Sequence, residues 1–280
     1  MGCSKLASGL ADDLDSVGEA AHQLGADVDE SFTGSGSLSS RADSLIEELS
    51  GVRTSCLLVP FTCTSGVATR TFGGCTIGRK AYVRTGDVIV TLKKSDESGT
   101  CVISEAATIL RQPNFAITRS TTGTLTVTSA DVTAYDTTAT FGSGQKLTKV
   151  SAGNYTWDTL GINRTFTNTV GTEVFNMSFK TSTALTITGT SRATRKITAG
   201  TWEVYHNIAK YTASLAFDNV AWEAGCNEPT SGTVTGTLTG SQSGTFTLTF
   251  GACGTSTLVY TETGKEAAST SVESDSSSED

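Results

Sequence analysis

The densest group of side chains that could do chemistry lies between positions 202 and 223. It contains Trp202, Glu203, Tyr205, His206, Asp218, Trp222 and Glu223. Two carboxylates on either side of a glycosidic bond can hydrolyse it, which makes Glu203 and Asp218 a candidate catalytic pair. Aromatic rings next to polar groups can also bind sugars without catalysis. The candidate ligand platform consists of Trp202, Tyr205, Asp218 and Trp222.

Alternation along a strand argues for a simpler interpretation of this group. Successive side chains of a strand point to opposite faces, so Glu203 and Tyr205 would share one face and Trp202 and His206 the other. The pattern then describes core aromatic residues with solvated acids beside them. We therefore favour a structural role over a sugar platform, and a sugar platform over a glycosidase.

The sequence contains none of the short motifs that mark common active sites. The G-x-S-x-G nucleophile elbow, the glycine-rich phosphate loops and the EF-hand calcium loop are all absent. The two histidines, His22 and His206, are far from the cysteines, and no C-x-x-C occurs. The sequence thus predicts no catalytic residue, no metal site and no cofactor. We therefore expect that the protein is not an enzyme.

Charge excludes one class of partner. The net charge is −8 and the isoelectric point is about 4.9. Binding to phosphate backbones requires clustered lysine and arginine, so we expect no nucleic-acid partner. The chain also has no run of 18 apolar residues, and we expect no transmembrane helix.

Seven cysteines indicate disulfides plus one further function. Without Cys3, the other six could close three disulfides, which would require an oxidising compartment; buried reduced thiols are the alternative. Cys226 and Cys253 flank a predicted hairpin from Gly232 to Phe250, whose pairing would bring them together, so we predict a Cys226–Cys253 disulfide. The remaining four allow three pairings, and the sequence does not choose among them. They are Cys56, Cys63, Cys75 and Cys101.

The first residues of the chain resemble those of another class of protein. The start "GCSK", followed by a polar stretch, resembles the mature N-terminus of a bacterial lipoprotein without its signal peptide. The resemblance implies that Cys3 carries the lipid. It also implies that Ser4 directs sorting to the outer membrane in a Gram-negative cell. N-myristoylation is the rival interpretation, but its pattern requires Ser or Thr where Leu6 stands.

Most of the chain is predicted to be β structure. It contains 50 threonines, 29 glycines and only three prolines, and strand patterns follow each other closely from about residue 54 to 263. This composition favours long strands joined by tight turns. We predict a mainly β fold, with a threonine-rich antiparallel meander that forms a large sheet or a sandwich. The β domain is assigned to residues 51–265.

The two ends of the chain are predicted to differ from the β domain. Residues 1–50 are assigned to a helical segment with a Gly/Ser linker, because apolar residues recur at intervals of three and four between Ala7 and Val28. That segment could pack on its own β domain, form a self-associating stalk or remain a tether. Residues 266–280 are assigned to an acidic disordered tail, because they contain one valine and no aromatic residue.

These features together predict a non-enzymatic lipoprotein of the cell envelope that acts in binding, adhesion or scaffolding. Its expected partners are the membrane, through the lipid, and an envelope glycan or another envelope protein. The alternatives are a fibre or stalk subunit that oligomerises through the N-terminal helix, and a carbohydrate-binding or glycan-acting protein.

Overall fold

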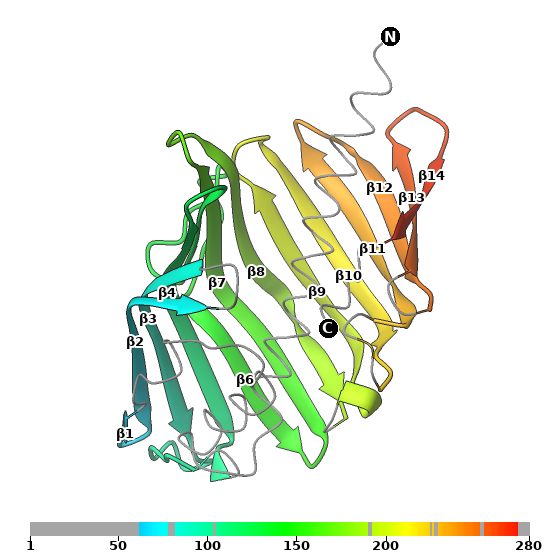
Figure 1. Cartoon of the computed structure of the whole chain (residues 1–280). Helices are drawn as coiled ribbons and strands as arrows, with labels where there is room; N and C mark the ends of the chain where they lie inside the picture. Colours follow the sequence, from blue (N-terminus) through cyan, green and yellow to red (C-terminus); the bar gives the residue numbers. More distant parts are fainter. Residues whose placement is uncertain are drawn as a thin grey trace.

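The computed structural model describes residues 62–77, 82–102, 105–189, 192–224, 226, 229–252 and 255–273. Within these residues, fourteen strands form one antiparallel sheet, which is strongly twisted and curved (Figure 1). The strands are β1 (Thr62–Thr64), β2 (Val67–Ile77), β3 (Tyr82–Lys93), β4 (Thr108–Arg119), β5 (Gly123–Thr128), β6 (Gly144–Ser151), β7 (Asn154–Asn168), β8 (Glu173–Thr188), β9 (Lys196–His206), β10 (Tyr211–Ala221), β11 (Ser231–Gly240), β12 (Gly244–Phe250), β13 (Thr255–Glu262) and β14 (Ala268–Glu273). A 3₁₀ turn, η3 (Arg192–Thr194), precedes β9.

The strands are ordered in space almost as they are in sequence. Each strand pairs with the next, and the path runs from the edge strand β1 to the edge strand β14. The exception lies between β4 and β7, which are 12 and 15 residues long and accommodate two short strands end to end. One end of both long strands pairs with β5, and the other end pairs with β6.

Side-chain alternation gives the sheet two different faces. On β10, Tyr211, Ala213, Leu215 and Phe217 are buried, whereas the residues between them are half-buried or exposed. We call the first side the apolar face and the opposite side the polar face. Threonine is well suited to the polar face because it is β-branched and also polar. Cross-strand threonine pairs such as Thr235 and Thr247 are found there.

The main core lies on the apolar face from β5 to β13. Its residues include Val127, Leu147, Trp157, Met177, Phe179, Leu185, Ile187, Trp202, Val204, Leu215, Phe217, Val234, Leu238, Phe246 and Leu258. Burial of apolar surface contributes about 25 cal/mol per Å², so this face supplies most of the stabilisation of the sheet.

The predicted β class and the antiparallel meander are confirmed. The described strands form one large sheet and no second sheet, so the sandwich alternative is not observed in this part of the chain. The hairpin from Gly232 to Phe250 is confirmed as β11 and β12, with Val234 and Leu248 directly opposite each other. The helical segment and linker assigned to residues 1–50 lie outside the described residues.

The prediction for the C-terminal tail is wrong in its first part. Residues 268–273 form β14 and pair with β13, from Thr255 opposite Glu273 to Tyr260 opposite Ala268. The prediction considered only side chains, whereas an open sheet edge offers backbone donors and acceptors to any extended segment. Residues 274–280 lie outside the described part.

The structure shows which of the three pairing schemes left open by the sequence applies to Cys63. Cys63 on β1 is bonded to Cys101 in the loop after β3, with 5.8 Å between their Cα atoms. The bond attaches the three-residue edge strand to the body of the sheet. Cys226 is also disulfide-bonded and is buried. Cys253 lies outside the described residues, so the Cys226–Cys253 pairing stays a prediction.

Candidate functional site

A loop from a distant part of the chain lies over the polar face of β8, β9 and β10. The loop consists of residues 129–143, which connect β5 to β6, and we call it the crossing loop. The amide of Ser129 donates to the Pro113 carbonyl at its start (2.8 Å), and the amide of Gly142 donates to the Leu160 carbonyl at its end (2.9 Å). The loop is therefore fixed at both ends to strands of the same sheet.

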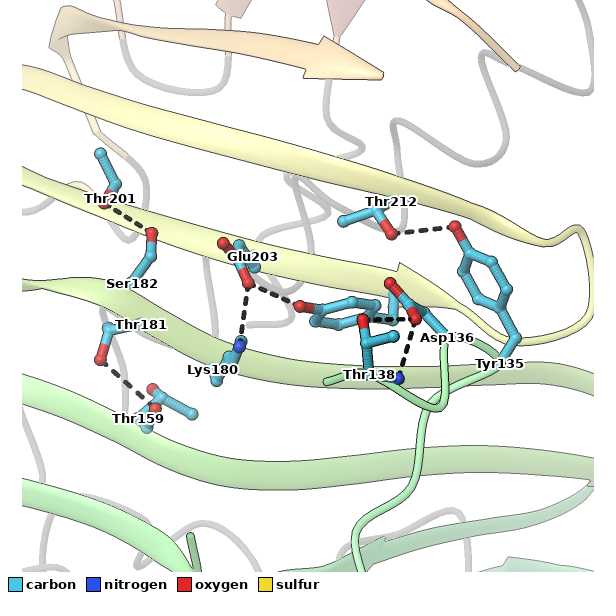
Figure 2. A network of polar contacts seen from close by, with 11 residues as sticks. Tyr135, Asp136, Thr138, Thr159, Lys180, Thr181, Ser182, Thr201, Glu203 and Thr212 are labelled. Carbon is cyan, nitrogen blue, oxygen red and sulfur yellow. Dashed lines mark hydrogen bonds and ion pairs between the residues drawn. The ribbon is translucent and has the colours of Figure 1, made fainter. Parts of the chain in front are cut away.

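Tyr135 makes the longest-range contacts of the crossing loop. Its hydroxyl lies 2.9 Å from Oγ1 of Thr212 on β10, and its backbone amide donates to Oδ1 of Asn207 at 2.8 Å. Figure 2 shows Tyr135 reaching toward Thr212 from the loop. These bonds join segments more than 70 residues apart in sequence, so they fix the loop to the sheet.

A turn inside the loop is closed by Asp136. Its Oδ1 accepts hydrogen bonds from the backbone amide of Thr138 (3.0 Å) and from the Thr138 hydroxyl (2.8 Å), as Figure 2 shows. The hydrogen bond from the Thr138 amide lowers the pKa of Asp136, and the hydrogen bond from the Thr138 hydroxyl lowers it further. The carboxylate thus favours its charged form and stabilises the turn.

The aromatic side chain at the centre of the site is Tyr205. Its ring makes edge contacts with Phe141, at 5.5 Å between centroids, and with Tyr135, at 6.5 Å. Lys180 lies beside the same rings, with Nζ 5.8 Å from the Phe141 centroid and 5.7 Å from that of Tyr205. Only 5% of Tyr205 is exposed, although it points to the polar face. The crossing loop is what buries it.

The polar centre of the site is a chain of three side chains. The Tyr205 hydroxyl donates to Oε2 of Glu203 at 2.6 Å. The Lys180 ammonium lies 3.3 Å from the same oxygen, and Figure 2 shows this ion pair. Burial raises the pKa of Tyr205, and the bond to Glu203 raises it further. The phenol therefore stays protonated at physiological pH, as a donor held by a carboxylate.

An amide network extends the site toward the end of β9. The side-chain amide of Asn207 donates to Oδ1 of Asn176 (2.7 Å) and to Oγ of Ser178 (2.9 Å). Asn163 donates to the same two atoms, each at 3.0 Å. The Ser178 hydroxyl in turn donates to the carbonyl of Thr133 in the crossing loop. Side chains from β7 and β8 and from the turn after β9 therefore hold the loop at a second place.

The geometry does not fit a paired-carboxylate glycosidase. Glu203 is opposite Ser214 in the register, and Asp218 lies four residues further along β10 on the same face. At about 3.3 Å per residue, this places the two carboxylates roughly 13 Å apart along the strand. Retaining and inverting enzymes place them about 5–5.5 Å and 6.5–9.5 Å apart. Glu203 also already accepts a hydrogen bond from Tyr205 and pairs with Lys180.

The four residues of the candidate ligand platform are not brought together. Trp202 and Trp222 are each 4% exposed and belong to the core of the apolar face. Trp202 packs against Phe179 and Phe217, at 5.4 and 6.5 Å between centroids. Tyr205 lies on the other face, because three positions along a strand reverse the side. Asp218 is exposed and accepts a hydrogen bond from the neighbouring Asn219.

Sequence reasoning missed the contributions of Tyr135, Phe141 and Lys180. Tyr135 and Phe141 are the two aromatic residues of an otherwise polar segment, "SADVTAYDTTATFGS". Such isolated rings need a surface to pack on, and this was the available signal. His206 is buried, and its Nδ1 accepts a hydrogen bond from the amide of Ala209 at 3.0 Å. Among the described residues, no three His, Cys, Asp or Glu side chains are arranged to hold a metal ion.

Comparison with known proteins gives no match: no family model, no curated protein and no solved structure is similar to the chain. Within the described part, no helix is long and apolar enough to cross a membrane. Cys3, the expected lipidation site, lies outside the described residues.

Proposed function

We propose that this chain is an exported lipoprotein of the cell envelope that acts by binding or scaffolding and not by catalysis. The observation that supports export most directly is the Cys63–Cys101 disulfide, together with the disulfide at Cys226. Structural disulfides persist in oxidising compartments and are rare in the cytosol. Export is also what a lipid on Cys3 requires.

A lipid on Cys3 would attach the protein to the outer membrane. The proposal rests on the Gly-Cys-Ser start of the chain. A cysteine that carries two or three acyl chains binds stably, because each buried methylene contributes about 0.8 kcal/mol. The segment that follows Cys3 would then link the bilayer to the edge of the sheet at β1.

Binding is proposed to occur on the polar face at the crossing loop. Tyr135 and Phe141 are half-buried there, beside the partly exposed ion pair of Lys180 and Glu203. Aromatic rings next to paired charges provide both apolar contact and polar specificity. Tyr205 does not serve as a nucleophile in this proposal, because its raised pKa keeps it protonated. The ligand class that suits this surface is an envelope glycan, and a protein partner is the alternative.

The anchoring proposal is tested by labelling in cells. The full chain with a lipoprotein signal peptide is produced in a Gram-negative host with an alkyne fatty acid, and label and membrane fractionation are measured. Cys3→Ser should abolish the label and release folded protein, whereas the neighbouring Ser4→Ala should retain both label and membrane attachment. Unlabelled wild-type protein, or Cys3→Ser protein that remains in the membrane, would refute the proposal.

The binding proposal is tested by co-sedimentation with peptidoglycan and with lipopolysaccharide. Tyr135→Ala and Phe141→Ala should reduce the bound fraction at least fivefold. Thr235→Ala, on the polar face of β11 and away from the loop, should leave it unchanged. Equal retention of all four proteins would refute a glycan site at the crossing loop, and retention on a protein partner instead would support the alternative.

A further inference from the structure

The turn between β9 and β10 holds a lysine in a backbone conformation that suits glycine. Lys210 has a φ angle of +63°, in the left-handed region that residues with a side chain rarely adopt. Its amide donates to the His206 carbonyl at 2.8 Å, and its carbonyl accepts from the Ser241 amide at 3.0 Å. Glycine or asparagine would meet the needs of this turn at a lower conformational cost. The advantage of lysine at this position must therefore come from its side chain.

The side chain of Lys210 lies at the crossing loop. Its Nζ is 5.8 Å from the centroid of the Tyr135 ring, a distance at which a ring attracts a cation. Gly240 at the end of β11 allows this close approach. A Cβ atom at position 240 would lie 2.6 Å from the Lys210 carbonyl oxygen and 2.9 Å from the Tyr135 hydroxyl. Lys210 and Tyr135 together therefore form one end of the proposed binding surface.

Lys210 carries the charge of this surface that is left for a ligand. It is exposed, and it belongs to no ion pair among the residues that the structure describes. At the other end of the surface, Lys180 is paired with Glu203. The second acid of the site, Asp136, accepts two hydrogen bonds from Thr138. The carboxylates of the site are thus engaged, and the ammonium of Lys210 is accessible.

A hydroxyl pair next to this ammonium has one proton to spare. The hydroxyls of Tyr135 and Thr212 are 2.9 Å apart, and either of them could be the donor. Each hydroxyl has a single proton, so the bond between them uses only one of the two. The accepting hydroxyl keeps its own proton for a further acceptor, and both residues are only half-buried. An ammonium group beside a free O–H donor suits an oxyanion.

We propose that the ligand of the crossing loop is an anionic glycan, whose carboxylate or phosphate group binds between Lys210 and the hydroxyl pair of Tyr135 and Thr212. The inference rests on the proposed function and names the ligand class of the same surface. The ammonium forms an ion pair with the anion, and the spare hydroxyl proton forms a hydrogen bond to it. The rings of Tyr135 and Phe141 contact the adjoining sugar. Envelope glycans offer both anions, as carboxylates on peptidoglycan and as phosphates on lipopolysaccharide.

Lys210→Gly separates a ligand-binding role from a structural one. Glycine adopts the φ angle of this turn without strain, so the variant should be at least as stable as wild type in urea unfolding. Its bound fraction in co-sedimentation should nevertheless fall at least fivefold, as should that of Lys210→Gln. Lys210→Arg retains the charge and should retain binding within about twofold. The matched control is Lys149→Gln, an exposed lysine at the far end of β6, which should leave binding unchanged.

Neutralised glycans identify which anion is bound. Amidation with ethanolamine removes the carboxylate charge of peptidoglycan, and hydrofluoric acid removes the phosphates of lipopolysaccharide. One of these treatments should lower wild-type binding to the level of Lys210→Gln, and it should not weaken Lys210→Gln further. Wild-type binding should also decline between about 0.05 M and about 0.5 M salt, because exposed charges are screened. Undiminished binding to both neutralised glycans would overturn the anionic class.

The variants distinguish failure of this inference from failure of the proposed function. If Tyr135→Ala weakens glycan binding while Lys210→Gln and Lys210→Gly bind like wild type, the crossing loop binds a glycan without using an anion. That result overturns this inference alone. If wild-type protein binds neither glycan, or if Tyr135→Ala binds as tightly as wild type, the glycan site and this inference are overturned together.

Discussion

The ring of Phe246 lies directly over Gly236, its cross-strand partner in the β11–β12 hairpin. A Cβ atom at position 236 would lie only 2.2 Å from ring carbons Cε1 and Cζ of Phe246. The glycine is therefore required by space and not by backbone conformation. The buried ring of Phe246 fills the space that a side chain at position 236 would occupy on the apolar face.

Gly236→Ala should destabilise the protein although alanine is the more favourable residue in a strand. The added methyl group must displace a ring that is 3% exposed, and overpacking of this kind costs about 1–3 kcal/mol. Urea unfolding measures the change. The control is Gly73→Ala on β2, where no atom of the described residues lies within 4 Å of the added Cβ, so stability should be unchanged or slightly raised. Equal stability of the two variants would contradict the close contact.

Alkaline pH should reveal the raised pKa of Tyr205. In the folded state the pKa of the Tyr205 phenol lies above the ordinary value of 10.0. The protonated phenol therefore contributes fully to the unfolding free energy below about pH 10, and this contribution is lost as the pH rises further. Tyr205→Phe should therefore lose less unfolding free energy than wild type between about pH 8 and pH 11. Burial also raises the pKa of Tyr260. The unfolding free energy of the Tyr205→Phe variant should therefore still decline with pH, but by a smaller amount. Identical pH profiles would show that burial and the hydrogen bond to Glu203 do not raise the pKa of Tyr205.

Loss of the edge disulfide should cost substantial stability. The Cys63–Cys101 bond spans a sequence separation of 38 residues. Cys63→Ser should lower the unfolding free energy by about 2–4 kcal/mol, mainly through a freer unfolded chain. Cys3→Ser should leave it unchanged. Peptide mapping without reduction should also find Cys226–Cys253 and, by elimination among the six, Cys56–Cys75; a disulfide to Cys3 would contradict this set.

Removal of the last strand should expose an edge without damaging the core. Deletion of residues 266–280 removes β14 and leaves the backbone of β13 unpaired. We expect faster amide hydrogen exchange in β13 and concentration-dependent association, since open edges pair with other chains. Deletion of residues 274–280 alone retains β14 and should produce neither effect. Unchanged exchange in β13 after the longer deletion would show that β14 does not protect it.

The sequence predicted the features that depend on local periodicity. Alternation was sufficient for the hairpin expected between Gly232 and Phe250, which the structure forms as β11 and β12. It also separated Trp202 from Tyr205 correctly, because a side chain's face depends only on its position along the strand. These properties need no knowledge of the rest of the chain.

The candidate site could not be predicted in the same way. Tyr135 meets Thr212 across 77 residues, and nothing near either residue specifies the other. The burial of Tyr205 follows from the path of the crossing loop, which depends on anchors at Pro113 and Leu160 in other strands. For β14, the missing information was the open edge of β13 and not a property of residues 268–273.

The nearly sequential order of the strands also affects how the chain can fold during the export proposed above. From β2 onward, each strand except β6 pairs with the strand made just before it, so most pairings close short loops and carry a small entropic cost. A polypeptide that emerges from a translocation channel with its N-terminus first could therefore add strands one at a time to a single growing edge. The pair β5 and β6 interrupts this series, because both remain uncovered until β7 emerges and pairs with each of them. Under the export proposal, folding during translocation would pause before residue 154 and then proceed strand by strand toward β14.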